Sequence, residues 1–260
     1  TSLLTRLAGE FVIVFFVLSG FSIAHSLSSN QSVLEFYKRR FIRIYPSYFV
    51  ALVFAALIYV ITKYWHPQWY DGTLTTFCFE RTAEMKNFFD PVKKKKNLFY
   101  MPGRGLITPF WSLTYEVMFY LMAPFLLRKL NVYAAVSLIL FFINLVAPSF
   151  ISSLKLPLYI HDYFFVYNIY FVAGILLYKN YDLVLQAFSG IKKVPMLFIM
   201  AGLLGIVYFF NLYFQKQTNY GFIFAALLGV FLIIFFLRHQ VKIKWLVNIG
   251  RFSYTLYITH

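Results

Sequence analysis

Four cationic side chains gather in the short stretch FYKRRFIRIYP, residues 36–46, between two apolar segments. Two of them, Arg40 and Arg43, are three residues apart, so on a helical turn both guanidinium groups point to one side. The planar fork of arginine matches phosphate oxygens better than lysine does, and such a pair could hold a diphosphate at a membrane surface. A cationic anchor that meets anionic lipid explains the same residues, and from the residues alone we favour the anchor.

A single acid lies deep inside the apolar stretch TPFWSLTYEVMFYLMAP, residues 108–124. Glu116 follows Phe110 by about 9 Å of helix, which places it well within a membrane span. An ionised group at the centre of a span costs about 2.5 to 3.5 kcal/mol, so Glu116 must be protonated, paired or facing a wet cavity. Ser112 and Tyr120 lie four residues to either side, on the same stripe of the helix. We therefore expect a functional role for Glu116 in preference to a purely structural hydrogen bond.

Small and polar residues interrupt another apolar stretch, FFVLSGFSIAHSL, residues 15–27. Gly20 and Ala24 form a small-xxx-small pair, which lets a neighbouring helix approach closely. Together with Ser19 they are compatible with helix packing or with the lining of a ligand site, and composition favours packing.

The histidines carry no recognisable catalytic or metal-binding pattern. His25 and His161, the latter beside Asp162, lie near the ends of apolar stretches, and we interpret both as interfacial or packing residues. The sequence contains no H-E-x-x-H spacing, no G-x-S-x-G elbow and no glycine-rich phosphate loop. It therefore predicts no metal site.

The elements that position these residues must be membrane helices. The 260 residues are 61% hydrophobic and only 13% charged, with a mean hydropathy of +0.69, well outside the composition of a soluble domain. The single cysteine, Cys78, excludes an intrachain disulfide. The net charge of +15 would suggest nucleic acid as a partner of a soluble protein. Here the cations fall between apolar runs, where they meet lipid headgroups, so we expect a lipid bilayer and no nucleic acid as partner.

About 20 apolar residues are needed for a helix to cross a bilayer, and helix is the structure that pairs all backbone groups in lipid. The sequence therefore predicts an all-α, polytopic transmembrane helical bundle. We expect one membrane domain over 1–260, with 63–108 as an extracytoplasmic loop. The eight predicted spans are 8–27, 44–62, 109–127, 132–150, 161–178, 194–214, 220–237 and 245–260.

Lysine and arginine in the short loops predict the orientation of these spans. The short loops on the predicted extracytoplasmic side hold only Lys155 and Lys216, far fewer cations than the loops on the cytoplasmic side. We discount the 63–108 loop because long loops cross the membrane largely regardless of their charge. We expect a further helix before Thr1 and another after His260, giving ten spans in the intact protein. The predicted cytoplasmic connections hold Lys38, Arg39, Arg40, Arg43, Arg128, Lys129, Lys179, Lys192, Lys193, Arg238, Lys242 and Lys244.

Five motifs in this order together resemble the acyltransferase-3 family, which comprises bacterial integral-membrane enzymes that O-acetylate lipopolysaccharide O-antigen, exopolysaccharides and related glycans. The resemblance spans nearly the whole chain. The motifs are FFVLSGF (15–21), YKRRFIRIYP (37–46), FWSLTYEVMFYLMAP (110–124), YFVAGILLYK (170–179) and IGRFSYTLYITH (249–260).

The resemblance implies a multi-pass protein of the bacterial cytoplasmic (inner) membrane with no bound cofactor. Such a protein moves an acyl group, usually acetyl, from acyl-CoA to a hydroxyl of a cell-surface polysaccharide or glycolipid. In the family, an Arg-x-x-Arg engages the coenzyme A phosphates, and this motif falls on Arg40 and Arg43. The resemblance also implies a cavity lined by family motif residues, which fall on Ser19, Gly20, Phe21, Trp111, Ser112 and Tyr120, with Glu116 as a supporting catalytic residue.

The family's first helix carries an arginine and a histidine that are regarded as the catalytic centre. This sequence begins after that helix, so we expect the catalytic histidine upstream of Thr1 and expect the fragment by itself to be inactive.

Two other classes of function remain open. In a transporter or flippase for a glycolipid or small solute, Glu116 would be a proton or substrate site and the arginines would only set topology. A catalytically idle membrane scaffold is the third interpretation. The acceptor sugar, the identity of the acyl group and the oligomeric state cannot be read from the residues.

Overall fold

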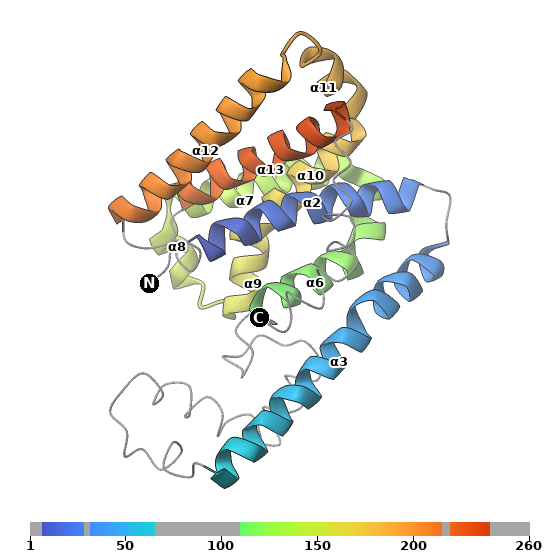
Figure 1. Ribbon diagram of the computed structural model, residues 1–260, viewed down its shortest axis with the longest axis vertical. Helices are drawn as coiled ribbons and strands as arrows, with labels where there is room; N and C mark the ends of the chain where they lie inside the picture. Colours follow the sequence, from blue (N-terminus) through green and yellow to red (C-terminus); the bar gives the residue numbers. More distant parts are fainter. Residues whose placement is uncertain (1–6, 29–31, 66–109, 215–218, 240–260) are drawn as a thin grey trace. The chain divides into compact units, whose positions relative to one another are not determined.

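The computed structural model describes residues 7–28, 32–65, 110–214 and 219–239, which are folded almost entirely into helices (Figure 1). No strand occurs in this part of the chain, which confirms the all-α prediction. Ser112–Val146 covers most of the predicted spans 109–127 and 132–150, and the predicted span 245–260 lies outside the described residues. Stretches long and apolar enough to cross a membrane are Ala8–Ser28, Ser112–Val146, Leu158–Lys179, Lys193–Phe214 and Asn219–His239.

Helix α3 (Val33–Trp65) is longer than the predicted span 44–62. It begins before the cationic stretch, so Arg40 and Arg43 lie on the same continuous helix as the apolar residues that follow. It ends at Trp65, two residues beyond the predicted start of the extracytoplasmic loop. The rest of that loop, from residue 66 to residue 108, lies outside the described residues.

The middle of the chain forms α6 (Phe110–Leu126), a 3₁₀ turn η2 (Leu127–Lys129) and α7 (Leu130–Val146). Lys129 leaves helical geometry, with φ −126° and ψ 51°. The turn therefore separates two spans where the sequence predicted a connection at Arg128 and Lys129.

The predicted span 161–178 is built from three helical pieces. These are α9 (Leu158–His161), a π-helical segment η3 (Asp162–Tyr167) and α10 (Asn168–Lys179), preceded by the short helix α8 (Pro148–Ser153). The chain continues through α11 (Tyr181–Ala187), α12 (Lys193–Phe214) and α13 (Asn219–His239). The short α11 was not predicted.

The chain divides into two compact units. The first holds Thr1–Val33 and Phe119–Lys242, and the second holds Leu34–Met118 and Ile243–His260. Among the described residues, the second unit contains nearly all of α3 and the beginning of α6.

Helix α2 (Ala8–Ser28) is the central helix of the first unit, packed against α10 and α13 (Figure 1). Two glycines bring α2 and α10 together. A Cβ at Gly20 would lie 2.1 Å from the carbonyl oxygen of Phe171, and one at Gly174 would lie 2.0 Å from that of Val17. In lipid, helices associate through close packing of this kind because no hydrophobic force drives them together.

Polar side chains link the helices inside the first unit. The Asn168 amide on α10 donates to Ser137 Oγ on α7 at 2.7 Å, and the Tyr133 hydroxyl donates to Asn168 Oδ1. At another contact, the Asn211 amide on α12 donates to Glu10 Oε1 on α2 at 3.0 Å. Hydrogen bonds between membrane helices are worth about 0.6 to 1.7 kcal/mol each, so these pairs fix neighbours as well as satisfying buried groups.

Candidate functional site

A pocket of about 520 Å³ opens at the C-terminal ends of α2, α10 and α13, all within the first unit. Its volume falls in the range of about 300 to 1,000 Å³ that is typical of small-molecule sites. The lining residues are Phe21, Ser22, His25, Tyr178, Tyr181 and Leu237.

Tyr178, in the last turn of α10, is held from three directions. Its hydroxyl shares a 2.6 Å hydrogen bond with Ser28 Oγ at the end of α2. Phe21 and His25 both meet its ring nearly at right angles, with centroid distances of 5.3 Å and 5.6 Å. Because Phe21 and His25 are four residues apart, they lie on one face of α2 and hold Tyr178 between them and Ser28.

Tyr181 forms the neighbouring part of the wall, and a cation of α13 holds its helix. The rings of Tyr178 and Tyr181 are nearly parallel, at 20°, with centroids 6.1 Å apart. Tyr181 begins α11, and the Arg238 guanidinium donates to the carbonyl oxygens of Phe188 and Ser189 at the other end of that helix. Carbonyl groups at a helix C-terminus lack partners within the helix and attract cations, so Arg238 anchors α11 to α13.

His25 lies in the wall of this pocket, where the sequence suggested an interfacial or packing residue. It is exposed in the last turn of α2. A histidine in such a position can donate or accept a hydrogen bond toward a ligand. Its four-residue spacing from Phe21 was the signal that could have identified it.

The three residues of the Ser-Gly-Phe motif face different surroundings. Phe21 lines the pocket, Gly20 packs against the backbone of α10, and Ser19 is buried in α2. The structure thus brings Phe21 together with His25 and Tyr178, and gives Gly20 a packing contact.

In the second unit, Arg40 and Arg43 lie one turn apart on α3. Arg40 is 9% exposed, and its guanidinium carbon lies 5.3 Å from the ring centroid of Phe36. Arg43 is exposed. The acid of this stretch, Glu35, forms its ion pair with Arg39 at 3.1 Å.

The polar stripe predicted on α6 is buried. Ser112 and Tyr120 are buried to a similar degree as Glu116, which is 3% exposed. The side chain of Trp111 lies outside the described residues. A second buried acid, Glu10 on α2, accepts a hydrogen bond from the Asn211 amide.

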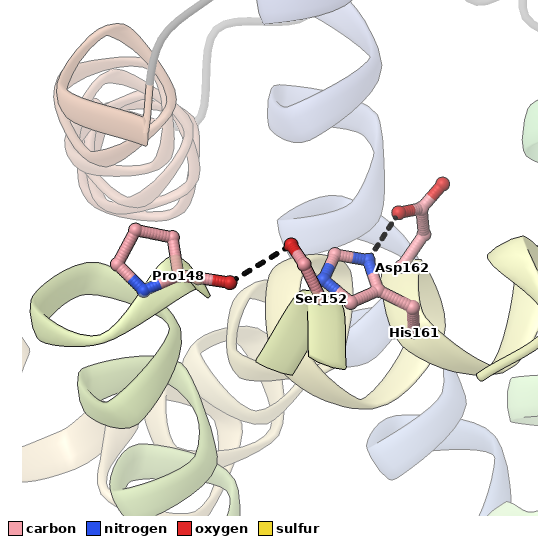
Figure 2. A network of polar contacts seen from close by, with 4 residues as sticks. All are labelled: Pro148, Ser152, His161 and Asp162. Carbon is pink, nitrogen blue, oxygen red and sulfur yellow. Dashed lines mark hydrogen bonds and ion pairs between the residues drawn. The ribbon is translucent and has the colours of Figure 1, made fainter. Parts of the chain in front are cut away.

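A histidine–aspartate pair lies at the far end of the Leu158–Lys179 stretch, about 25 Å from Tyr178 at 1.5 Å per residue. Figure 2 shows Nδ1 of His161 turned to Asp162, 2.8 Å from its Oδ1, and Ser152 donating to the Pro148 carbonyl. Within the described part of the chain, no three His, Cys, Asp or Glu side chains form a group that could hold a metal ion.

Comparison with known proteins agrees with the motifs. The family model of the acyltransferase-3 type, described as an acyltransferase domain, matches residues 2–260. Acyltransferase MdmB of Streptomyces mycarofaciens is 32% identical over 136 residues, which cover 50% of this chain and 32% of that protein. The aligned region thus spans about a third of the curated relative's length, and no solved structure matches. Because the family model matches almost every residue, the chain belongs to the acyltransferase-3 family.

Proposed function

We propose that this chain is the membrane domain of an O-acyltransferase of the bacterial inner membrane. It transfers an acyl group, with acetyl as the first candidate, from acyl-CoA to a hydroxyl of a cell-surface polysaccharide or glycolipid. The observation that carries the proposal is the match of an acyltransferase family model to residues 2–260 of a chain with five stretches able to cross a membrane.

Arg40 and Arg43 are the proposed ligands of the coenzyme A phosphates. They lie one turn apart on α3, where Arg40 is buried and Arg43 is exposed. The ring of Phe36 stabilises the Arg40 guanidinium through a cation–π contact. Two guanidinium forks one turn apart offer a diphosphate several charge-assisted hydrogen bonds.

The proposed reaction is attack of the acceptor hydroxyl oxygen on the thioester carbonyl. A base removes the proton of the hydroxyl, the new C–O bond forms, and the C–S bond breaks. The coenzyme A thiolate leaves and takes up a proton. We propose that the base is the histidine that the family resemblance implies. Glu116, buried in α6, is the proposed supporting carboxylate that orients this histidine.

The test uses membranes that contain the full-length protein, labelled acetyl-CoA and extracted cell-envelope glycans. The variant Arg40→Ala/Arg43→Ala is compared with Lys38→Ala/Arg39→Ala, which removes the same charge from the same helix. A charge-assisted hydrogen bond is worth about 1.5 to 3 kcal/mol, so the first variant should raise the KM for acetyl-CoA about tenfold or more. The second should change it by less than about twofold, as expected for exposed charges.

Equal effects of the two variants would reject the phosphate-binding role. Locating the label on the glycan by mass spectrometry tests the acceptor class. A full-length protein that labels no envelope component would contradict the proposed transfer and leave glycolipid transport as the alternative.

A further inference from the structure

We infer that the pocket at the C-terminal ends of α2, α10 and α13 binds the adenine ring of the acyl-CoA donor. This inference rests on the proposed function. Its principal contact is Tyr181, with Tyr178, Ser22 and His25 as the other groups that meet the ring.

The pocket lies at the end of the first unit where cations are concentrated. Lys179 follows Tyr178 directly, and Arg238 follows Leu237. The other predicted cytoplasmic connections of this unit hold Arg128, Lys129, Lys192 and Lys193. The predicted opposite side of this unit holds Arg6, Lys155 and Lys216. The excess of cations predicts the cytoplasmic side. It also makes this end the attractive one for an anionic nucleotide.

The wall of the pocket suits a flat heteroaromatic ring. Tyr181 is 39% exposed and nearly parallel to Tyr178, so the two rings present faces on which a base can stack. Aromatic side chains stack on every base because every base has a π-face. Ser22 and His25 are exposed beside them and can donate or accept hydrogen bonds at the edge of the base. The volume of about 520 Å³ leaves room for the attached ribose.

The site is held in place before any ligand arrives. Ser28, Phe21 and His25 fix the ring of Tyr178. Arg238 fixes α11, the helix that begins with Tyr181. A ring that is already ordered loses little conformational entropy on binding, which favours recognition of a rigid planar group.

The experiment compares two donors, acetyl-CoA and acetyl-pantetheine, with the full-length protein. Acetyl-pantetheine carries the same thioester but lacks the nucleotide. Tyr181→Ala should lower the preference for acetyl-CoA over acetyl-pantetheine by about 5- to 150-fold, the factor that one stacked base contributes. Tyr181→Trp, which keeps a stacking face, should restore the preference. Leu183→Ala, at a 67% exposed position of the same helix, is the control and should leave the preference unchanged.

If Tyr181→Ala lowers activity with both donors by the same factor, the pocket serves the acceptor or the catalytic step, and the inference is overturned. An unchanged preference would overturn it as well. Binding of adenosine 3′,5′-bisphosphate to the purified protein, measured by calorimetry, separates this failure from failure of the proposed function. Suppose that the unaltered protein transfers no acyl group yet binds this nucleotide, and that Tyr181→Ala weakens the binding. The pocket assignment then stands and the acyl-transfer proposal falls. If the unaltered protein does not bind it, the assignment is wrong.

Discussion

Replacing Gly20 by alanine is expected to force α2 and α10 apart. The new Cβ would lie 2.1 Å from the carbonyl oxygen of Phe171, and 3.0 and 3.1 Å from that residue's carbonyl carbon and Cα. All three atoms belong to the backbone of α10, so no side chain can rotate away to make room.

The size of the effect follows from that distance. The separation of 2.1 Å falls about 1.3 Å short of the 3.4 Å at which ordinary contacts begin, and close-packed interiors transmit such strain to neighbouring groups. Overpacking of this kind costs about 1 to 3 kcal/mol. Alanine also favours a helix by about 1 kcal/mol over glycine, and this gain partly masks the cost. A control that shows the gain alone is therefore required.

Gly205→Ala on α12 is that control, because nothing lies within 4 Å of a Cβ at Gly205. We expect Gly20→Ala to be less stable than Gly205→Ala by about 1 to 3 kcal/mol, as measured by denaturant titration in detergent, because the helix-propensity gain is common to both variants and cancels. Gly174→Ala should behave like Gly20→Ala, because its Cβ would lie 2.0 Å from the Val17 carbonyl oxygen. Equal stability of Gly20→Ala and Gly205→Ala would refute the close α2–α10 contact.

Three further changes test other contacts of the first unit. Arg238→Ala should release the C-terminal carbonyl groups of α11 and weaken adenosine 3′,5′-bisphosphate binding severalfold, measured by calorimetry, while the melting temperature of the whole protein changes little. Tyr133→Phe should remove the hydrogen bond to Asn168 and cost about 0.6 to 1.7 kcal/mol in the same denaturant titration. Glu10→Gln keeps an acceptor for the Asn211 amide and should be more stable than Glu10→Ala by a similar amount. A Glu10→Gln variant as unstable as Glu10→Ala would show that the negative charge, rather than the hydrogen bond, matters at this position.

The five stretches able to cross a membrane could be predicted because each is a long apolar run, which is a strong signal in a sequence. Details within them could not. Helix α3 starts at Val33, ahead of its apolar run, because arginine and lysine are good helix formers and hydropathy does not register them. The π-helical turns of Asp162–Tyr167 leave no trace in the apolar pattern. The seven residues of α11 are too few to be stable alone, and a tertiary contact from Arg238 anchors them.

The candidate site divides in the same way. Arg40, Arg43 and Glu116 attract notice because a charge beside or inside an apolar run is expensive and therefore rare. Tyr178 and Tyr181 carry no such signal, since the chain has 21 tyrosines and an aromatic residue near a membrane interface is ordinary. Only the packing of α2 on α10, and the attachment of α11 to α13, shows which of these tyrosines meet at one pocket.

The glycine contact and the pocket are successive turns of one helix pair. Gly174 lies against Val17 and Phe21 of α2. Four residues later on α10, Tyr178 lies against Phe21 and His25. At Gly174, α10 presents no side chain to α2 and the two backbones touch. One turn later, α10 presents the large ring of Tyr178 where the pocket opens. Because the contact at Gly174 sets the register of the two helices, a shift there displaces Phe21 and His25 from Tyr178. Gly20→Ala should therefore weaken adenosine 3′,5′-bisphosphate binding as well as lowering stability. A purely structural role for the Ser-Gly-Phe motif predicts loss of stability alone.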